Sequence, residues 1–92
     1  MLIAIDYDET YTAAPVFWDQ VIKFGKTHGH DFICVTGRND RDVTEFIDSD
    51  IKTIYTDGEY KKVVCRKLGI SPDIWIDDSP GFIEPGRKLQ WD

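Results

Sequence analysis

Short continuous runs of apolar residues alternate along this chain with segments in which apolar residues recur every three or four positions. The continuous runs predict buried strands, at residues 2–5, 32–35, 51–56 and 74–76. The segments between them predict helices that cross from one strand to the next. This alternation favours an α/β domain built on a three-layer, doubly wound parallel sheet of four to five strands.

Three helices are predicted between these strands. The first begins at Pro15, because proline suits the first helical turn, and ends at Gly25 to Gly29. The second is capped by Asn39 or Asp40, and the third is capped by Thr56 or Asp57 and closed by Gly69. The expected apolar stripes are Phe17, Trp18, Val21, Ile22 and Phe24; then Val43, Phe46 and Ile47; then Val64, Cys65 and Leu68.

The composition is that of one folded domain covering residues 1–92, with 41% hydrophobic and 30% charged residues. The net charge of −6 excludes a uniformly basic surface, so nucleic acid is expected only as a substrate bound at a local site. Cys34 and Cys65 lie in apolar surroundings, which favours buried, reduced thiols and a cytoplasmic location. The first apolar run is too short for a signal peptide or a membrane span, so no membrane partner is expected.

Carboxylates follow the first and the last predicted strand. Asp6 and Asp8 come directly after residues 2–5, and Asp77 and Asp78 come directly after residues 74–76. Because the carboxyl ends of parallel strands meet at one edge of a sheet, these side chains are expected to lie together. A cluster of carboxylates needs a cation, and hard oxygen ligands suit Mg²⁺. The sequence therefore predicts a magnesium site at this edge.

Groups suited to binding a phosphate follow the second strand. The hydroxyl of Thr36 can donate to a phosphoryl oxygen, Gly37 lets the backbone approach closely, and Arg38 offers a planar fork of donors. A lysine of the third helix adds positive charge. Lys61 and its neighbour Lys62 are both acceptably spaced from the last strand, but Lys61 shares the helix face of the apolar stripe and is the preferred candidate.

Taken in order, these residues resemble the haloacid dehalogenase superfamily, specifically its phosphatases with an aspartate nucleophile. The residues that carry the resemblance are Asp6-x-Asp8-x-Thr10, Thr36, Lys61 and Asp77-Asp78. The resemblance covers Met1 to Pro80. The chain departs from the family at Tyr11, where an aliphatic residue is usual. It implies a Rossmann-like fold, Mg²⁺ as cofactor and hydrolysis of phosphate monoesters.

The resemblance also implies roles for single residues. Asp6 would attack phosphorus to form an aspartyl-phosphate, and Asp8 would act as general acid and then general base. Thr36 and Lys61 would hold the transferring phosphoryl group, with Thr10, Gly37 and Arg38 as further substrate-binding residues. Mg²⁺ would be held by Asp6, the backbone carbonyl of Asp8, Asp77 and, through water, Asp78.

Relatives often carry a cap domain that covers the site, and this chain has no room for one. Only Tyr11 to Ala14 separate the first motif from the first helix, and only Asp57 to Tyr60 separate the third strand from Lys61. A site without a cap is open. We therefore expect a phosphorylated substrate that is either a small molecule, such as a nucleotide, or a macromolecule, such as a nucleic-acid end or a phosphoprotein.

Three alternatives stay open at this point. An acceptor hydroxyl in place of water would make the protein a phosphotransferase. A phosphoacceptor module similar to receiver domains would use Asp57, at the end of the third strand, as the acceptor. A catalytically silent member would bind Mg²⁺ without turnover.

A further short edge strand is predicted around Arg87 to Gln90, and His28 and His30 are expected on the surface.

Overall fold

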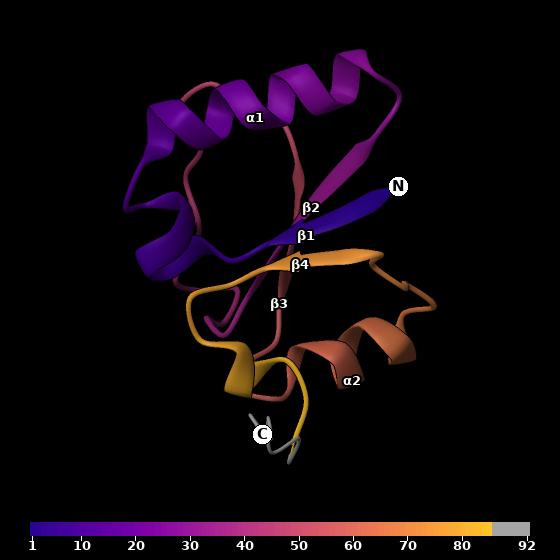
Figure 1. The fold of residues 1–92 in the computed structure, drawn as a ribbon. Helices are drawn as coiled ribbons and strands as arrows, with labels where there is room; N and C mark the ends of the chain where they lie inside the picture. The colour runs from indigo at the N-terminus through magenta and orange to yellow at the C-terminus, as the bar shows by residue number, and fades with distance from the viewer. Residues whose placement is uncertain (86–92) are drawn as a thin grey trace, which may run out of the picture.

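The computed structural model describes residues 1–85, and its strands form a single four-stranded sheet in which every neighbouring pair is parallel (Figure 1). The order across the sheet is β3-β2-β1-β4. The strands are β1 (Leu2–Ile5), β2 (Asp31–Thr36), β3 (Lys52–Tyr55) and β4 (Ile74–Ile76). The predicted parallel sheet and the positions of its four main strands are thus confirmed. The fifth strand predicted around Arg87 to Gln90 lies outside the described residues.

Two α-helices cover the sheet from opposite sides. In Figure 1, α1 (Pro15–Thr27) lies over one face and α2 (Lys61–Lys67) lies over the other. Pro15 is the first residue of α1, as predicted, and Gly69 follows α2 with a φ of +73°, a left-handed conformation that glycine adopts without strain. Two short coiled segments, η1 (Tyr7–Tyr11) and η2 (Pro80–Phe82), follow β1 and β4. No helix within residues 1–85 combines the length and the apolar character that crossing a membrane requires.

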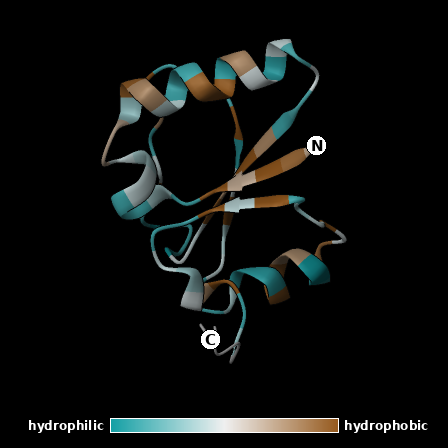
Figure 2. Cartoon of the chain, viewed as in Figure 1, coloured by the Kyte–Doolittle hydropathy of each residue, from teal (hydrophilic) through white to brown (hydrophobic). Residues whose placement is uncertain are grey.

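Apolar side chains fill both sides of the sheet, and the strands are accordingly coloured brown to white over much of their length in Figure 2. One cluster lies on the α2 side of the sheet and consists of Ala4, Ile33, Val35, Ile54 and Cys65. The other lies on the opposite side and consists of Ile5, Tyr7, Tyr11 and Cys34. Alternate residues of β1 and β2 enter opposite clusters, as the pleat of a strand requires. Cys34 and Cys65 are both buried and free, as expected.

The face that α1 buries differs from the predicted apolar stripe. Ile22 is 2% exposed, but Phe17 and Phe24 are 59% and 68% exposed. The reason is Asp19, which is buried in α1 one turn before Ile22 and accepts hydrogen bonds there. Pointing Asp19 inward fixes the rotation of the helix and turns the two phenylalanines outward. In α2 the predicted stripe also ends early, because the helix stops at Lys67 and leaves Leu68 exposed.

The helix predicted to start at Asn39 or Asp40 does not form, and residues 37–51 run from β2 to β3 as an irregular segment. Side chains from other elements bind backbone groups that a helix would have paired internally. The hydroxyl of Tyr7 bonds to both N–H and C=O of Glu45, and the amide of Ile47 donates to the hydroxyl of Tyr11. The amide of Asp48 donates to Asp19. These contacts outweigh the local helical pattern.

Aromatic packing fixes the middle of the same segment. The ring of Phe46 lies 5.6 Å from that of Tyr7 and 4.6 Å from that of Tyr11, measured between centroids. Val43 and Ile47, which the helical pattern had placed beside Phe46 on a buried face, are exposed. The apolar spacing in residues 43–47 therefore reflects one partly buried aromatic residue and two exposed aliphatic ones.

Candidate active site

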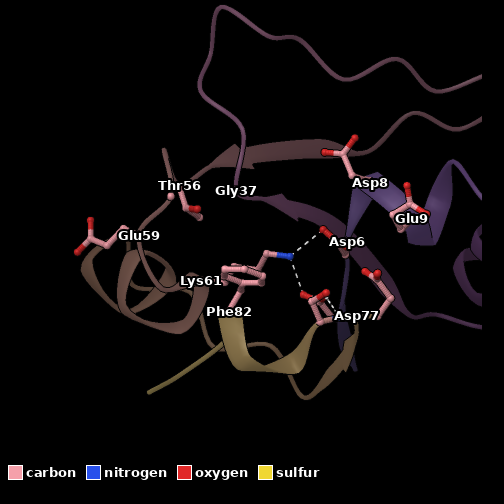
Figure 3. A pocket seen from close by; sticks show the side chains of 12 residues that line it. Asp6, Asp8, Glu9, Gly37, Thr56, Glu59, Lys61, Asp77 and Phe82 are labelled. Carbon is pink, nitrogen blue, oxygen red and sulfur yellow. Dashed lines mark hydrogen bonds and ion pairs between the residues drawn. The ribbon is translucent and has the colours of Figure 1, made fainter. Parts of the chain in front are cut away.

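A cavity of about 310 Å³ opens at the carboxyl ends of the strands (Figure 3). Residues that follow all four strands line it: Asp6 after β1, Gly37 after β2, Thr56 after β3, and Asp77 after β4. The first residue of α2, Lys61, enters the same cavity. The topology thus brings side chains from five places in the chain to one site.

The chain turns sharply directly after Asp6, and this turn places Asp6 at the cavity wall. The amide of Asp6 extends the sheet by donating to the carbonyl of Ile76 at 2.9 Å. The backbone then coils through η1, with Glu9 at a φ of +63°, so that the hydroxyl of Thr10 returns to within 3.2 Å of Asp6 Oδ2. Asp6 is buried by this turn. Burial raises the pKa of Asp6, and the hydrogen bond from Lys61 opposes the rise without cancelling it.

Lys61 bridges two carboxylates from different strands. Its Nζ lies 2.7 Å from Asp6 Oδ1 and 2.6 Å from Asp77 Oδ2, as the dashed lines in Figure 3 show. Lys61 is 3% exposed. Burial acts to lower the pKa of Lys61, but the hydrogen bonds to Asp6 and Asp77 outweigh it, and the pKa is raised. Lys61 therefore carries its charge at neutral pH. Lys62 lies outside this group and pairs with Glu84 at 3.1 Å.

The second acidic pair is tied to the first through Thr10. The Oγ1 of Thr10 lies 3.2 Å from Asp78 Oδ1 as well as from Asp6, and it accepts a hydrogen bond from the amide of Asp78. Asp77 accepts a hydrogen bond from the amide of Ser79 at 2.9 Å through its other oxygen. Thr10 is thus a positioning residue between the ends of β1 and β4.

The donor set fits a divalent cation. Oxygens of Asp6, Asp77 and Asp78 lie within 4.8 Å of one another. Three carboxylates beside the single ammonium of Lys61 leave an excess of two negative charges when all are ionised, which a divalent cation neutralises. Hard carboxylate oxygens match the ligands that Mg²⁺ prefers. These residues are three of the four predicted metal ligands.

Asp8, whose backbone carbonyl is the fourth predicted ligand, lines the cavity as well, while its carboxylate is bound by a residue outside the acidic cluster. The guanidinium of Arg38 binds both oxygens of Asp8, at 2.7 and 2.9 Å, and also contacts Asp42 at 3.1 Å. In Figure 3 the Asp8 side chain lies apart from the Asp6, Lys61 and Asp77 group. The hydrogen bonds from Arg38 lower the pKa of Asp8. The structure therefore pairs the predicted acid–base residue with the predicted phosphate-binding arginine.

Two more predicted residues, Thr36 as the last residue of β2 and Gly37 directly after it, differ in their access to the cavity. Gly37 lines it, and its carbonyl accepts a hydrogen bond from the amide of Gly58 at 2.9 Å. Thr36 is fully buried, is absent from the lining, and accepts a hydrogen bond from the amide of Arg38 at 3.3 Å. The Thr36 hydroxyl thus lies behind the cavity wall.

Thr56 and Phe82 are among the lining residues that sequence reasoning missed. Thr56 was predicted to cap a helix, but α2 begins later, after Tyr60, so Thr56 is free to face the cavity. The available signal was a hydroxyl residue directly after β3, similar to Thr36 at the end of β2. Phe82 reaches the cavity because the Pro80-Gly81 turn folds back over the end of β4.

Comparison of the chain with protein-family models, with curated proteins and with solved structures gave no match. The geometry of this site and the order of its residues in the sequence are therefore the observations that bear on function.

Proposed function

We propose that the protein is a Mg²⁺-dependent phosphohydrolase of the haloacid dehalogenase type, which cleaves phosphate monoesters through an aspartyl-phosphate on Asp6. The observation that carries the proposal is the buried Asp6 carboxylate at the end of β1, bonded to Lys61 and adjoining Asp77 and Asp78 in an open cavity. The hydroxyl of Thr10 holds the second oxygen of Asp6. A carboxylate fixed from two sides is pre-oriented for attack.

In the first step, a carboxylate oxygen of Asp6 forms a bond to phosphorus while the bond from phosphorus to the ester oxygen breaks. The leaving oxygen takes a proton from Asp8. In the second step, water attacks the phosphoryl group, gives a proton to Asp8 and releases inorganic phosphate, which restores Asp6. Because Arg38 holds both oxygens of Asp8 and lowers its pKa, this role requires the Asp8 side chain to turn from Arg38 toward the cavity and to take up a proton before the first step.

Other residues stabilise charge during these steps. The Lys61 ammonium stays within bonding distance of Asp6 and offsets the negative charge that a phosphate dianion brings to the site. Arg38 provides donors for phosphate oxygens once Asp8 releases it. Mg²⁺ held by Asp6, Asp77 and Asp78 would reduce the repulsion between the carboxylate and the phosphate.

Two observations favour this proposal over a phosphoacceptor module with Asp57 as the acceptor. Asp57 follows β3, an edge strand of the described sheet, whereas Asp6 follows β1, one of its two interior strands. Asp57 is also absent from the lining of the cavity that contains Lys61 and the acidic cluster.

The test is Mg²⁺-dependent phosphate release by the wild type and by Asp6→Asn. The panel is an aryl phosphate, nucleotides, 5′- and 3′-phosphorylated DNA and RNA ends, and a phosphopeptide. We expect release that chelation and Asp6→Asn each abolish. Asp57→Asn is the matched control, since it makes the same change at an exposed aspartate outside the cavity.

Peptide mapping of the protein quenched in acid during turnover identifies the phosphorylated residue. Phosphate on Asp6 supports the proposal, and transfer of phosphate to an added alcohol in place of water would make the protein a phosphotransferase. Phosphate on Asp57, or activity that Asp6→Asn retains, would refute the mechanism.

A further inference from the structure

The cavity contains a buried hydroxyl group that has no hydrogen-bond partner. Thr56 is 4% exposed, and within residues 1–85 its Oγ1 is the single buried side-chain oxygen or nitrogen for which no partner is found. Thr56 lies at the end of β3, and in Figure 3 it stands on the opposite side of Lys61 from Asp77. Burying a hydroxyl without a partner is unfavourable, so such a group in a cavity wall points to a ligand.

The backbone holds Thr56 in place. Its amide donates to the carbonyl of Thr36 at 2.9 Å, and its carbonyl accepts from the amide of Glu59 at 3.0 Å. Two residues after Thr56, the amide of Gly58 donates to the carbonyl of Gly37, which follows β2. Two strand ends and a turn thus fix the Cα of Thr56, and only rotation of the side chain can bring its hydroxyl to a partner.

Nearby protein groups do not supply an acceptor for this hydroxyl. The neighbouring acidic residue, Glu59, pairs with Lys67 at 2.9 Å. The carboxylates of Asp6 and Asp77 bond to Lys61 instead. With no acceptor found among the described residues, a molecule that enters the cavity can supply one.

We propose that Thr56 Oγ1 donates a hydrogen bond to an oxygen of the phosphoryl group bound in this cavity, beside Lys61. This inference rests on the proposed phosphohydrolase function and adds a binding residue to it. A phosphoryl oxygen suits the position because an anionic oxygen accepts strongly from a hydroxyl, and Lys61 lies in the same cavity to balance its charge. Thr36, the other threonine at a strand end, is absent from the cavity lining.

The first test measures thermal unfolding of the ligand-free protein. Thr56→Val keeps the shape of the side chain and removes the hydroxyl. Because this hydroxyl lacks a partner, we expect the Tm of Thr56→Val to equal or exceed that of the wild type. A Tm several degrees lower would show that the hydroxyl has a structural partner, and it would overturn the inference.

The second test measures the affinity for inorganic phosphate by titration calorimetry with Mg²⁺ present. We expect Thr56→Val to weaken binding about tenfold or more, the usual effect of losing a hydrogen bond to a charged group. Thr56→Ser retains the hydroxyl and is expected to bind within a few-fold of the wild type. The matched control is Thr53→Val on the same strand, because Thr53 Oγ1 bonds to Thr44 and Thr53 is absent from the cavity lining.

The outcomes separate this inference from the proposed function. Equal phosphate affinity in the wild type and Thr56→Val would overturn the role of Thr56 and leave the phosphohydrolase proposal standing. Absence of phosphate binding by the wild type would overturn both. Weaker binding by Thr56→Val, with Thr56→Ser and Thr53→Val close to the wild type, supports the inference.

Discussion

Asp19 is the residue that should most affect stability outside the candidate active site. Its carboxylate accepts three hydrogen bonds: from the hydroxyl of Tyr11 at 2.7 Å, from the amide of Asp48 at 3.2 Å and from the hydroxyl of Ser49. Asp19→Ala removes all three hydrogen bonds at once. Since alanine is the best helix former, the substitution leaves α1 itself intact.

The expected cost follows from the exposure of each donor. Tyr11 is 1% exposed, so its hydroxyl loses a charged acceptor that water cannot replace, at about 2–3 kcal/mol. The donors of Asp48 and Ser49 lie nearer the surface, and water can partly replace their acceptor, so each loss costs about 0.5–1 kcal/mol. Asp19→Ala should therefore lower the free energy of unfolding by about 3–5 kcal/mol, a large part of the stability of a small domain.

Urea-induced unfolding, followed by circular dichroism and tryptophan fluorescence, measures this change. Asp19→Asn is the graded control: Tyr11 and Ser49 both donate to Oδ1, which the amide oxygen can replace, whereas the amide nitrogen would face the N–H of Asp48. We expect the asparagine variant to lose about 1–2 kcal/mol. A loss below about 1 kcal/mol for Asp19→Ala would refute the explanation given for the irregular segment 37–51.

Three further predictions concern the site and the core. Lys61→Met should abolish turnover. In the presence of a chelator it should also lower the free energy of unfolding by about 3–5 kcal/mol, because Asp6 and Asp77 lose their buried counter-charge. Mg²⁺ should raise the Tm of this variant more than that of the wild type. Burial raises the pKa of the Cys34 thiol to about 12. The folded state thus keeps a proton that the unfolded state loses, so stability should fall as the pH rises above about 9, and Cys34→Ser should flatten this slope in urea titrations. Gly25→Ala should destabilise by about 1–3 kcal/mol in thermal unfolding, despite the helix propensity of alanine, because a Cβ there would collide with the ring of Phe32.

The sequence predicted the elements whose signals are local. Continuous apolar runs identified the four strands, and Pro15 and Gly69 marked one end of each α-helix. The order of strand-end carboxylates placed Asp6, Asp77 and Asp78 together, and helical phase selected Lys61 over Lys62 for contact with them. These predictions needed only the periodicity of single elements and the rule that the carboxyl ends of parallel strands share an edge.

What the sequence did not predict depends on partners distant in the chain. The segment around Phe46 has helical spacing, but hydroxyls from Tyr7 and Tyr11 bind its backbone. The sequence showed that Tyr11 departs from the resembled family. It did not show that the hydroxyl of Tyr11 donates a hydrogen bond to Asp19. The ion pair of Asp8 with Arg38 was also missed, because Asp8 had been assigned to acid–base catalysis and Arg38 to substrate binding. Propensity and periodicity do not specify such long-range polar contacts.

The irregular segment 37–51 also bears on the order in which the chain folds. A helix in this place could form early from contacts within one turn, but here the contacting residues are far apart in sequence: Tyr7 from Glu45 by 38 positions, and Asp19 from Asp48 by 29. The segment has few groups to bind until β1, η1 and α1 have assembled. We therefore expect residues 37–51 to become ordered after the folding transition state, so that substitutions within them change the unfolding rate and leave the folding rate nearly unchanged.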